Sequence, residues 1–143
     1  MKTGILLAAF GSASPQGESA LKNFAARASL RFPETRVRFA FTSDRMRTRL
    51  AAAGKKTDSV KKALCRMGFE RYTHVAVQSL HLIPGKEYEA LLEEIREARE
   101  QGGPKHVTVG SPLLHDGEDV RLAAGALLAH LPSIEHSVFA KVE

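Results

Sequence analysis

The chain has 143 residues, of which 43% are hydrophobic, and this is enough for one folded domain with its own core. Its single cysteine excludes an internal disulfide framework, and no stretch approaches the length of a membrane span or of a signal-peptide core. The net charge of +5 is concentrated in residues 36–71, where eleven Lys or Arg accompany three acids. This segment either binds an anionic partner or forms a solvated basic face without a partner, and both interpretations stay open. We therefore expect a single domain over residues 1–143 that works in the cytoplasm, away from the membrane.

The first part of the chain predicts two strands and an intervening helix. The continuous apolar run Ile5–Phe10 is typical of a strand that is covered on both faces. Ser14 followed by Pro15 is typical of a helix start, with serine as the cap and proline in the first turn. A second strand is predicted over residues 36–41. Apolar residues at helical spacing predict one buried stripe on the first helix, formed by Leu21, Phe24, Ala25 and Ala28.

The remaining elements repeat this alternation. Strands are predicted over residues 72–80 and 106–113. A helix with an apolar face ends at Gly68, another runs from Glu87 to Glu100, and a last one stops at Pro132. The apolar stripes of the helices are formed by Val60, Ala63, Leu64 and Met67, then by Tyr88, Leu91, Leu92, Ile95 and Ala98, and finally by Val120, Ala123, Ala124, Leu127, Leu128 and Leu131.

Strands that alternate with helices pair in parallel through right-handed crossovers. The sequence therefore predicts an α/β fold, doubly wound, with a mainly parallel four-stranded sheet and flanking helices. After the last helix the chain becomes apolar again at residues 138–140. We interpret residues 136–143 either as an edge strand or as the stump of a second half.

Ligands of such sheets bind beyond the carboxyl ends of the strands, which selects the loops at residues 10–17, 42–44, 81–87 and 112–118. In the third loop His81 directly follows a strand and Glu87 begins a helix. Imidazole and carboxylate suit a divalent first-row metal, and either group can accept protons. A purely structural role for both residues stays open. A glutamate at a helix N-terminus interacts favourably with the helix dipole, and a histidine in a loop can have all its hydrogen bonds within the fold. His115, in the fourth loop, is the second candidate histidine for a functional role at this edge.

Four segments stand in a distinctive order and spacing: LLAAFGS at 6–12, FAFTS at 39–43, VQSLHLIPGKEYE at 77–89 and GSPLL at 110–114. Together they resemble the N-terminal half of the CbiK-type anaerobic cobalt chelatases, and the resemblance extends from about residue 2 to residue 139. The third segment is the most diagnostic of the four. This family has two similar α/β halves that face each other across a cleft.

The resemblance implies a class II tetrapyrrole chelatase that inserts Co²⁺ into sirohydrochlorin in anaerobic cobalamin synthesis, with the cobalt as substrate and no prosthetic group. The family's glutamate metal ligand aligns with Glu87, so Glu87, together with His81, is expected to bind the metal and act in catalysis. Substrate-binding residues are expected in the matching loops: Phe10, Gly11, Ser12, Thr42, Ser43, Pro84 and Gly85. A basic segment also suits a substrate with many carboxylates.

The family's two histidine ligands belong to a second half, which these 143 residues do not match. We therefore expect a homodimer, or a complex with a complementary chelatase half, to complete the cleft around the sirohydrochlorin-like tetrapyrrole. The alternative is a degenerate, non-catalytic module that binds tetrapyrrole or metal. A nucleotide or nucleic-acid binder would rest on the basic segment alone, and an aromatic content of 6% offers few surfaces for base stacking, so no nucleic acid is expected.

Overall fold

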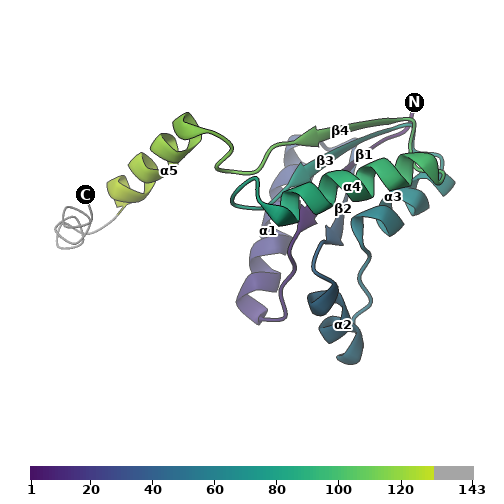
Figure 1. Cartoon of the computed structure of the whole chain (residues 1–143), viewed down its shortest axis with the longest axis horizontal. Helices are drawn as coiled ribbons and strands as arrows, with labels where there is room; N and C mark the ends of the chain where they lie inside the picture. Colours follow the sequence, from purple (N-terminus) through teal and green to yellow (C-terminus); the bar gives the residue numbers. More distant parts are fainter. Residues whose placement is uncertain (131–143) are drawn as a thin grey trace.

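A computed structural model, in which residues 1–130 are described, has a four-stranded sheet flanked by helices on both faces (Figure 1). The strands are β1 (Thr3–Ala9), β2 (Arg36–Phe41), β3 (His74–Ser79) and β4 (His106–Gly110), all parallel and in the order β2-β1-β3-β4. The helices are α1 (Pro15–Arg31), α2 (Asp44–Ala52), α3 (Val60–Phe69), α4 (Lys86–Glu100) and α5 (Gly117–His130). The predicted α/β fold is confirmed; the proposed stump at residues 136–143 lies outside the described residues.

The main core lies between the sheet and the helices α3 and α4, which Figure 1 shows on the opposite side of the sheet from α1. On this face every second strand residue is buried, as the two-residue period of a strand requires. The predicted apolar faces of α3 and α4 supply the other side. The core comprises Leu6, Ala8, Ala40, Val60, Ala63, Leu64, Met67, Tyr72, Val75, Val77, Leu91, Ile95 and Ala98.

The predicted buried stripe of α1 is wrong, because no residue of this helix is buried. Phe24 is 45% exposed, and the other members of the stripe are only partly covered. Helix α5, which could have shared this face of the sheet, projects away from it (Figure 1). For the same reason Val120 of α5, and Ala76 and Thr108 of the sheet, are exposed.

Two predicted boundaries move by a few residues in ways that shape the edge of the sheet. Strand β4 ends at Gly110 and not at residue 113, yet Leu113 and Leu114 donate backbone hydrogen bonds to the carbonyls of His81 and Leu82 (3.1 and 2.8 Å). The loops after β3 and β4 are therefore held together beyond the sheet. Gly68 lies inside α3, which continues to Phe69, and does not end the helix as predicted.

The carboxyl group of Glu94 in α4 provides a test of how the helices pack. Burial raises the pKa of Glu94, while a backbone hydrogen bond from Lys61 and the charge of Arg47 oppose the rise. A raised pKa in the folded state means that this group's contribution to stability is present at acid pH and is lost as the pH rises through the folded-state pKa. Glu94→Gln should therefore raise the melting temperature at pH 7, and the gain should shrink on acidification.

The matched control is Glu93→Gln on the exposed side of the same helix, where the ion pair with Arg96 contributes little to stability. Thermal unfolding followed by circular dichroism across pH 4–8 would compare the two variants. A Glu94→Gln protein that melts below the wild type at pH 7 would show that the ionised carboxylate is needed in the fold.

Candidate functional site

The loops after the first three strands converge at the carboxyl edge of the sheet through backbone hydrogen bonds. The amide of Thr42 donates to the carbonyl of Ala9 (2.8 Å), and the amide of Ser43 donates to that of Phe10 (3.3 Å). The amide of Leu80 likewise donates to Ala8 (2.8 Å). Because the strands are parallel and in register, the residues that follow them meet at one edge, as the sequence predicted.

A chain of side-chain hydrogen bonds crosses this edge and links β3, β2 and α4. Nδ1 of His81 lies 2.9 Å from the hydroxyl of Ser79, and Nε2 lies 3.0 Å from the hydroxyl of Thr42. The Thr42 hydroxyl is also 3.3 Å from Oε2 of Glu87. The two predicted metal-binding residues, His81 and Glu87, are therefore connected through the hydroxyl of a predicted substrate-binding residue.

His81 is held in place and in its neutral form. Its side chain is buried, and burial lowers the pKa of the imidazole, while the negative charge of Glu87 partly opposes this. Each ring nitrogen has a hydroxyl partner, so the single N–H and the acceptor nitrogen of a neutral imidazole are both satisfied. Burial and these two hydrogen bonds thus favour the neutral form of the imidazole.

Glu87 differs from His81 in that it is accessible to solvent. It lies in the first turn of α4, where the helix dipole favours a carboxylate, and the helix cap Gly85 offers no side chain to the free amides. The helix dipole explains why an acid is tolerated at this position. The hydrogen bond that Glu87 accepts from Thr42 is separate from that effect, because Thr42 lies on the loop after β2. The carboxylate is therefore oriented over the edge of the sheet and free to bind a ligand.

Apolar side chains surround this polar group without being buried. Phe10 is 47% exposed, and Leu82, Ile83 and Leu113 are exposed still further. All four lie on loops that follow β1, β3 and β4. Large exposed apolar side chains clustered at one edge are typical of a binding surface. Of these four, only Phe10 was predicted from the sequence as a site residue.

A cavity of about 640 Å³ opens beside His81, between α1 and the loops after β3 and β4. Its size is within the range of small-molecule sites. It is lined by Ala20, Leu21, Phe24, Gln78, Ser79, Leu80, His81, Ser111, Pro112, Leu113 and Asp119. The poorly covered face of α1 thus contributes directly to the hollow beside the candidate site.

Several predicted substrate-binding residues have a structural role in these loops. Gly11 has a φ of 112°, and a side chain there would collide with Met46 and Phe41. The hydroxyl of Ser12 lies 3.1 Å from that of Ser14, the cap of α1, and the buried Ser43 caps α2. Their contact with a substrate stays a prediction.

The other candidates do not join the cluster. Pro84 is exposed in the turn before α4. His115 is exposed at the start of α5, where its backbone amide donates to Asp119 (3.0 Å). Ser79, which orients His81, was not proposed as a site residue, although it lies two positions before His81 and so points to the same side of the strand end.

Among residues 1–130 there is no group of three or more His, Cys, Asp or Glu side chains that could hold a metal ion. Metal binding by His81 and Glu87 therefore stays a prediction, and a full coordination sphere would need further ligands. None of the helices in the same part of the chain has the length and apolarity that crossing a lipid bilayer requires.

The coupling of His81 to Glu87 can be measured directly. Because the charge of Glu87 raises the pKa of His81 against the effect of burial, Glu87→Gln should lower that pKa further. NMR titration of the His81 ring would show the shift, with Glu89→Gln on the same helix turn as the control. An unchanged or higher pKa in Glu87→Gln would contradict the geometry described above.

The chain matches a family model and is similar to curated proteins. The family model described as cobalt chelatase (CbiK) matches residues 3–139. The sirohydrochlorin cobaltochelatase CbiKC of Nitratidesulfovibrio vulgaris is 59% identical over 132 residues, which are 92% of this chain and 47% of that protein. The sirohydrochlorin cobaltochelatase of Salmonella typhimurium is 30% identical over 141 residues, which are 96% of this chain and 52% of that protein.

The chain thus spans about half the length of the curated relatives that it matches. The family match covers nearly the whole chain, including every loop that forms the candidate site. This chain belongs to the cobalt chelatase (CbiK) family.

Proposed function

We propose that this chain is one half of a sirohydrochlorin cobaltochelatase, which inserts Co²⁺ into sirohydrochlorin in anaerobic cobalamin synthesis. The names of its two relatives support this activity. The observation that carries the proposal is the juxtaposition of His81 and Glu87, linked through Thr42 at the carboxyl edge of the sheet.

The chemistry of metal insertion suits this pair. When Co²⁺ enters the ring, two pyrrole N–H protons must leave, and the metal must be held over the four nitrogens during the exchange. The accessible carboxylate of Glu87 can bind the incoming metal. When the Thr42 hydroxyl turns from Glu87 to donate to Nε2 of His81, it can pass one pyrrole proton to the neutral imidazole, and the second proton leaves to solvent. Positioning the metal against the ring converts a slow encounter into a step within one complex.

The surroundings of the pair suit a flat ring with acidic arms. The exposed side chains of Phe10, Leu82 and Ile83 can cover an apolar ring face. The first turn of α4 also carries Lys86, and the basic segment of residues 36–71 contains the loop after β2. Cations of this kind form charge-assisted hydrogen bonds with carboxylates.

We expect the other wall of the cleft to come from a second α/β unit, such as a second copy of this chain or a complementary chelatase half. The two donors within residues 1–130 leave the metal incompletely coordinated, and the apolar rim is uncovered. A two-fold pairing of copies would bring two such rims together. In that case paired Glu87 carboxylates would face the ring from both sides.

A non-catalytic module that binds the tetrapyrrole or the metal is the second candidate. This function is favoured because the described part of the chain contains no group of three or more side chains that could hold a metal ion. Binding of the ring would then need the apolar rim but would not need Glu87. The two functions therefore differ in what happens after binding.

An absorbance assay separates them. The purified chain, with its oligomeric state measured by sedimentation, is mixed with metal-free sirohydrochlorin and Co²⁺. Cobalt insertion above the uncatalysed rate supports the chelatase. Binding of sirohydrochlorin without any acceleration, in a sample shown to be an intact dimer, would support the binding module and contradict the enzyme.

A further inference from the structure

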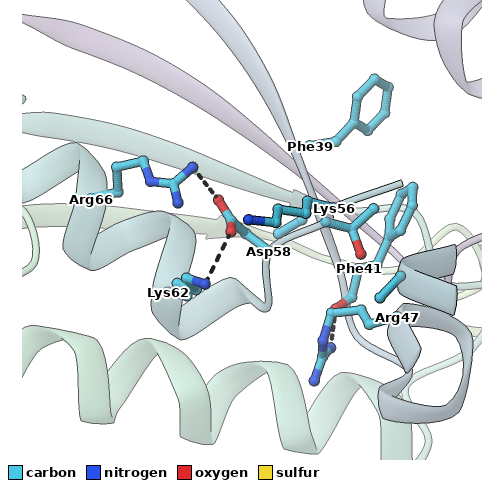
Figure 2. Close-up of a pocket in the computed structure, with 10 residues that line it drawn as sticks. Phe39, Phe41, Arg47, Lys56, Asp58, Lys62 and Arg66 are labelled. Carbon is cyan, nitrogen blue, oxygen red and sulfur yellow. Dashed lines mark hydrogen bonds and ion pairs between the residues drawn. The ribbon is translucent and has the colours of Figure 1, made fainter. Parts of the chain in front are cut away.

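A second cavity, of about 500 Å³, lies along the free edge of β2, between that strand, α2 and the segment that leads into α3 (Figure 2). It shares no residue with the hollow beside His81. It is lined by Phe39, Ala40, Phe41, Arg47, Ala51, Lys56, Thr57, Asp58, Lys62 and Arg66.

The charges in this cavity are unbalanced. Four cationic side chains, Arg47, Lys56, Lys62 and Arg66, accompany one lining carboxylate, that of Asp58. Figure 2 shows Lys62 and Arg66 paired with Asp58, and Lys56 among the lining side chains without such a pair. Arg66 lies 2.8 Å from the Asp58 carboxylate and Lys62 lies 4.0 Å from it. One carboxylate cannot neutralise three neighbouring cations, so a net positive charge remains.

The remaining cations differ in how they are held. Arg47 is fixed by the carbonyl of Phe41 and by the carboxylate of Asp44, which lies outside the lining. Lys56 makes no ion pair or hydrogen bond within residues 1–130, so its ammonium group is available to a ligand.

A third observation is independent of charge. The hydroxyl oxygen of Thr57 is buried and has no hydrogen-bond partner in the described part of the chain. Buried polar groups without a partner are rare in folded proteins, because their desolvation is not compensated. Thr57 lines the cavity. The same residue also lines a neighbouring hollow beside α1. Because the oxygen itself is buried, a ligand oxygen becomes its partner only when the Thr57 side chain turns toward the cavity.

We propose that this cavity binds an anionic oxygen group, a carboxylate or a phosphate, with Lys56, Lys62 and Arg66 as its cationic partners and Thr57 as a neutral donor. Three cations beside a single acid, together with an unsatisfied hydroxyl, fit an anion better than they fit a closed internal ion-pair network. The rings of Phe39 and Phe41, whose centroids are 6.4 Å apart, provide an apolar side for the body of the ligand.

The anion can come from two sources. Phe41 directly precedes Thr42 of the candidate site, so a peripheral carboxylate of a bound tetrapyrrole is one source, and this version rests on the proposed function. A free phosphate or phosphorylated small molecule is the other. The two share the same recognition chemistry and are distinguished by the ligand used in the test.

The test compares two substitutions that should act in opposite directions. Lys56→Met removes the unpaired cation and should weaken anion binding about tenfold. Asp58→Asn removes the competing carboxylate and should tighten binding severalfold. Lys105→Met, an exposed lysine in the turn before β4, makes the same charge change far along the chain and should have no effect. Circular dichroism would confirm that each variant is folded.

Calorimetric titrations with inorganic phosphate and, separately, with metal-free sirohydrochlorin provide the readout. Opposite shifts with phosphate support a free-anion site, and opposite shifts with sirohydrochlorin alone support a site for a substrate carboxylate. If sirohydrochlorin does not bind the wild type, the proposed function fails, but the phosphate titration still decides the cavity. If neither substitution changes the binding of either ligand, the cations only neutralise Asp58 and do not bind an anion, and the inference is overturned.

Discussion

Glu87→Gln is expected to slow cobalt insertion by on the order of 100-fold in the assembly that is active. The substitution keeps the size of the side chain and still allows a hydrogen bond with Thr42, but it removes the negative charge that we propose as a metal ligand. Because the site is exposed at the start of α4, the fold should be unaffected. Steady-state absorbance with metal-free sirohydrochlorin and Co²⁺ gives the rate.

Glu89→Gln is the matched control, since Glu89 lies in the same helix turn and is exposed but contacts none of the cluster. It should insert cobalt at the wild-type rate, and both variants should bind sirohydrochlorin with similar affinity. Equal rates for wild type and Glu87→Gln would remove Glu87 from the chemistry and would favour the non-catalytic binding module.

Gly68→Ala is expected to lower the free energy of unfolding by about 3 kcal/mol, the upper end for overpacking. A methyl group at this position in α3 would overlap the backbone carbonyl oxygen of Gly102, just after α4. Backbone cannot move aside as a flexible side chain can, so α3 and α4 would have to separate. The core between these helices and the sheet would loosen.

The control for this prediction is Gly125→Ala in α5, where an added methyl group meets nothing within 4 Å. Alanine is the better helix former, so this variant should be as stable as the wild type or more stable by about 0.5–1 kcal/mol. Urea unfolding measures both. A Gly68→Ala protein as stable as Gly125→Ala would mean that α3 and α4 are not packed as closely as described.

The sheet and its main core could be predicted because local patterns determine them. The continuous apolar run of β1 fits the most buried strand of the sheet, and the helical spacing of Leu64 and Met67 identifies the face of α3 that packs on it. Parallel pairing follows from the alternation of strands and helices. None of these inferences needs long-range information.

Burial on the other face could not be predicted, because it depends on which elements cover it. Leu21 and Phe24 have helical spacing on α1, but a stripe becomes buried only when neighbouring elements close over it. Helix α5 projects away (Figure 1), and Leu21 and Phe24 line the cavity beside His81. Sequence periodicity identifies the side of a helix that avoids water and does not show how completely it is covered.

The candidate site was predictable in part for a similar reason. The rule that ligands bind at the carboxyl ends of strands selects His81 and Glu87, and the family resemblance adds Thr42. The hydrogen bonds of Ser79 and Thr42 with His81 depend on side-chain geometry that spacing does not fix. In the sequence, the basic cavity appeared only as a basic segment. The fold determines that Asp58 and Thr57 line the same cavity as the cations.

The central claim is that the edge formed by the loops after β1, β2 and β3 is one wall of a cleft for a flat tetrapyrrole. A crystal structure of the protein with metal-free sirohydrochlorin tests it most directly. We predict that the ring lies against Phe10 and Leu82, with the carboxylate of Glu87 directed at its centre. A ring bound elsewhere, or one from which Glu87 points away, would contradict the claim.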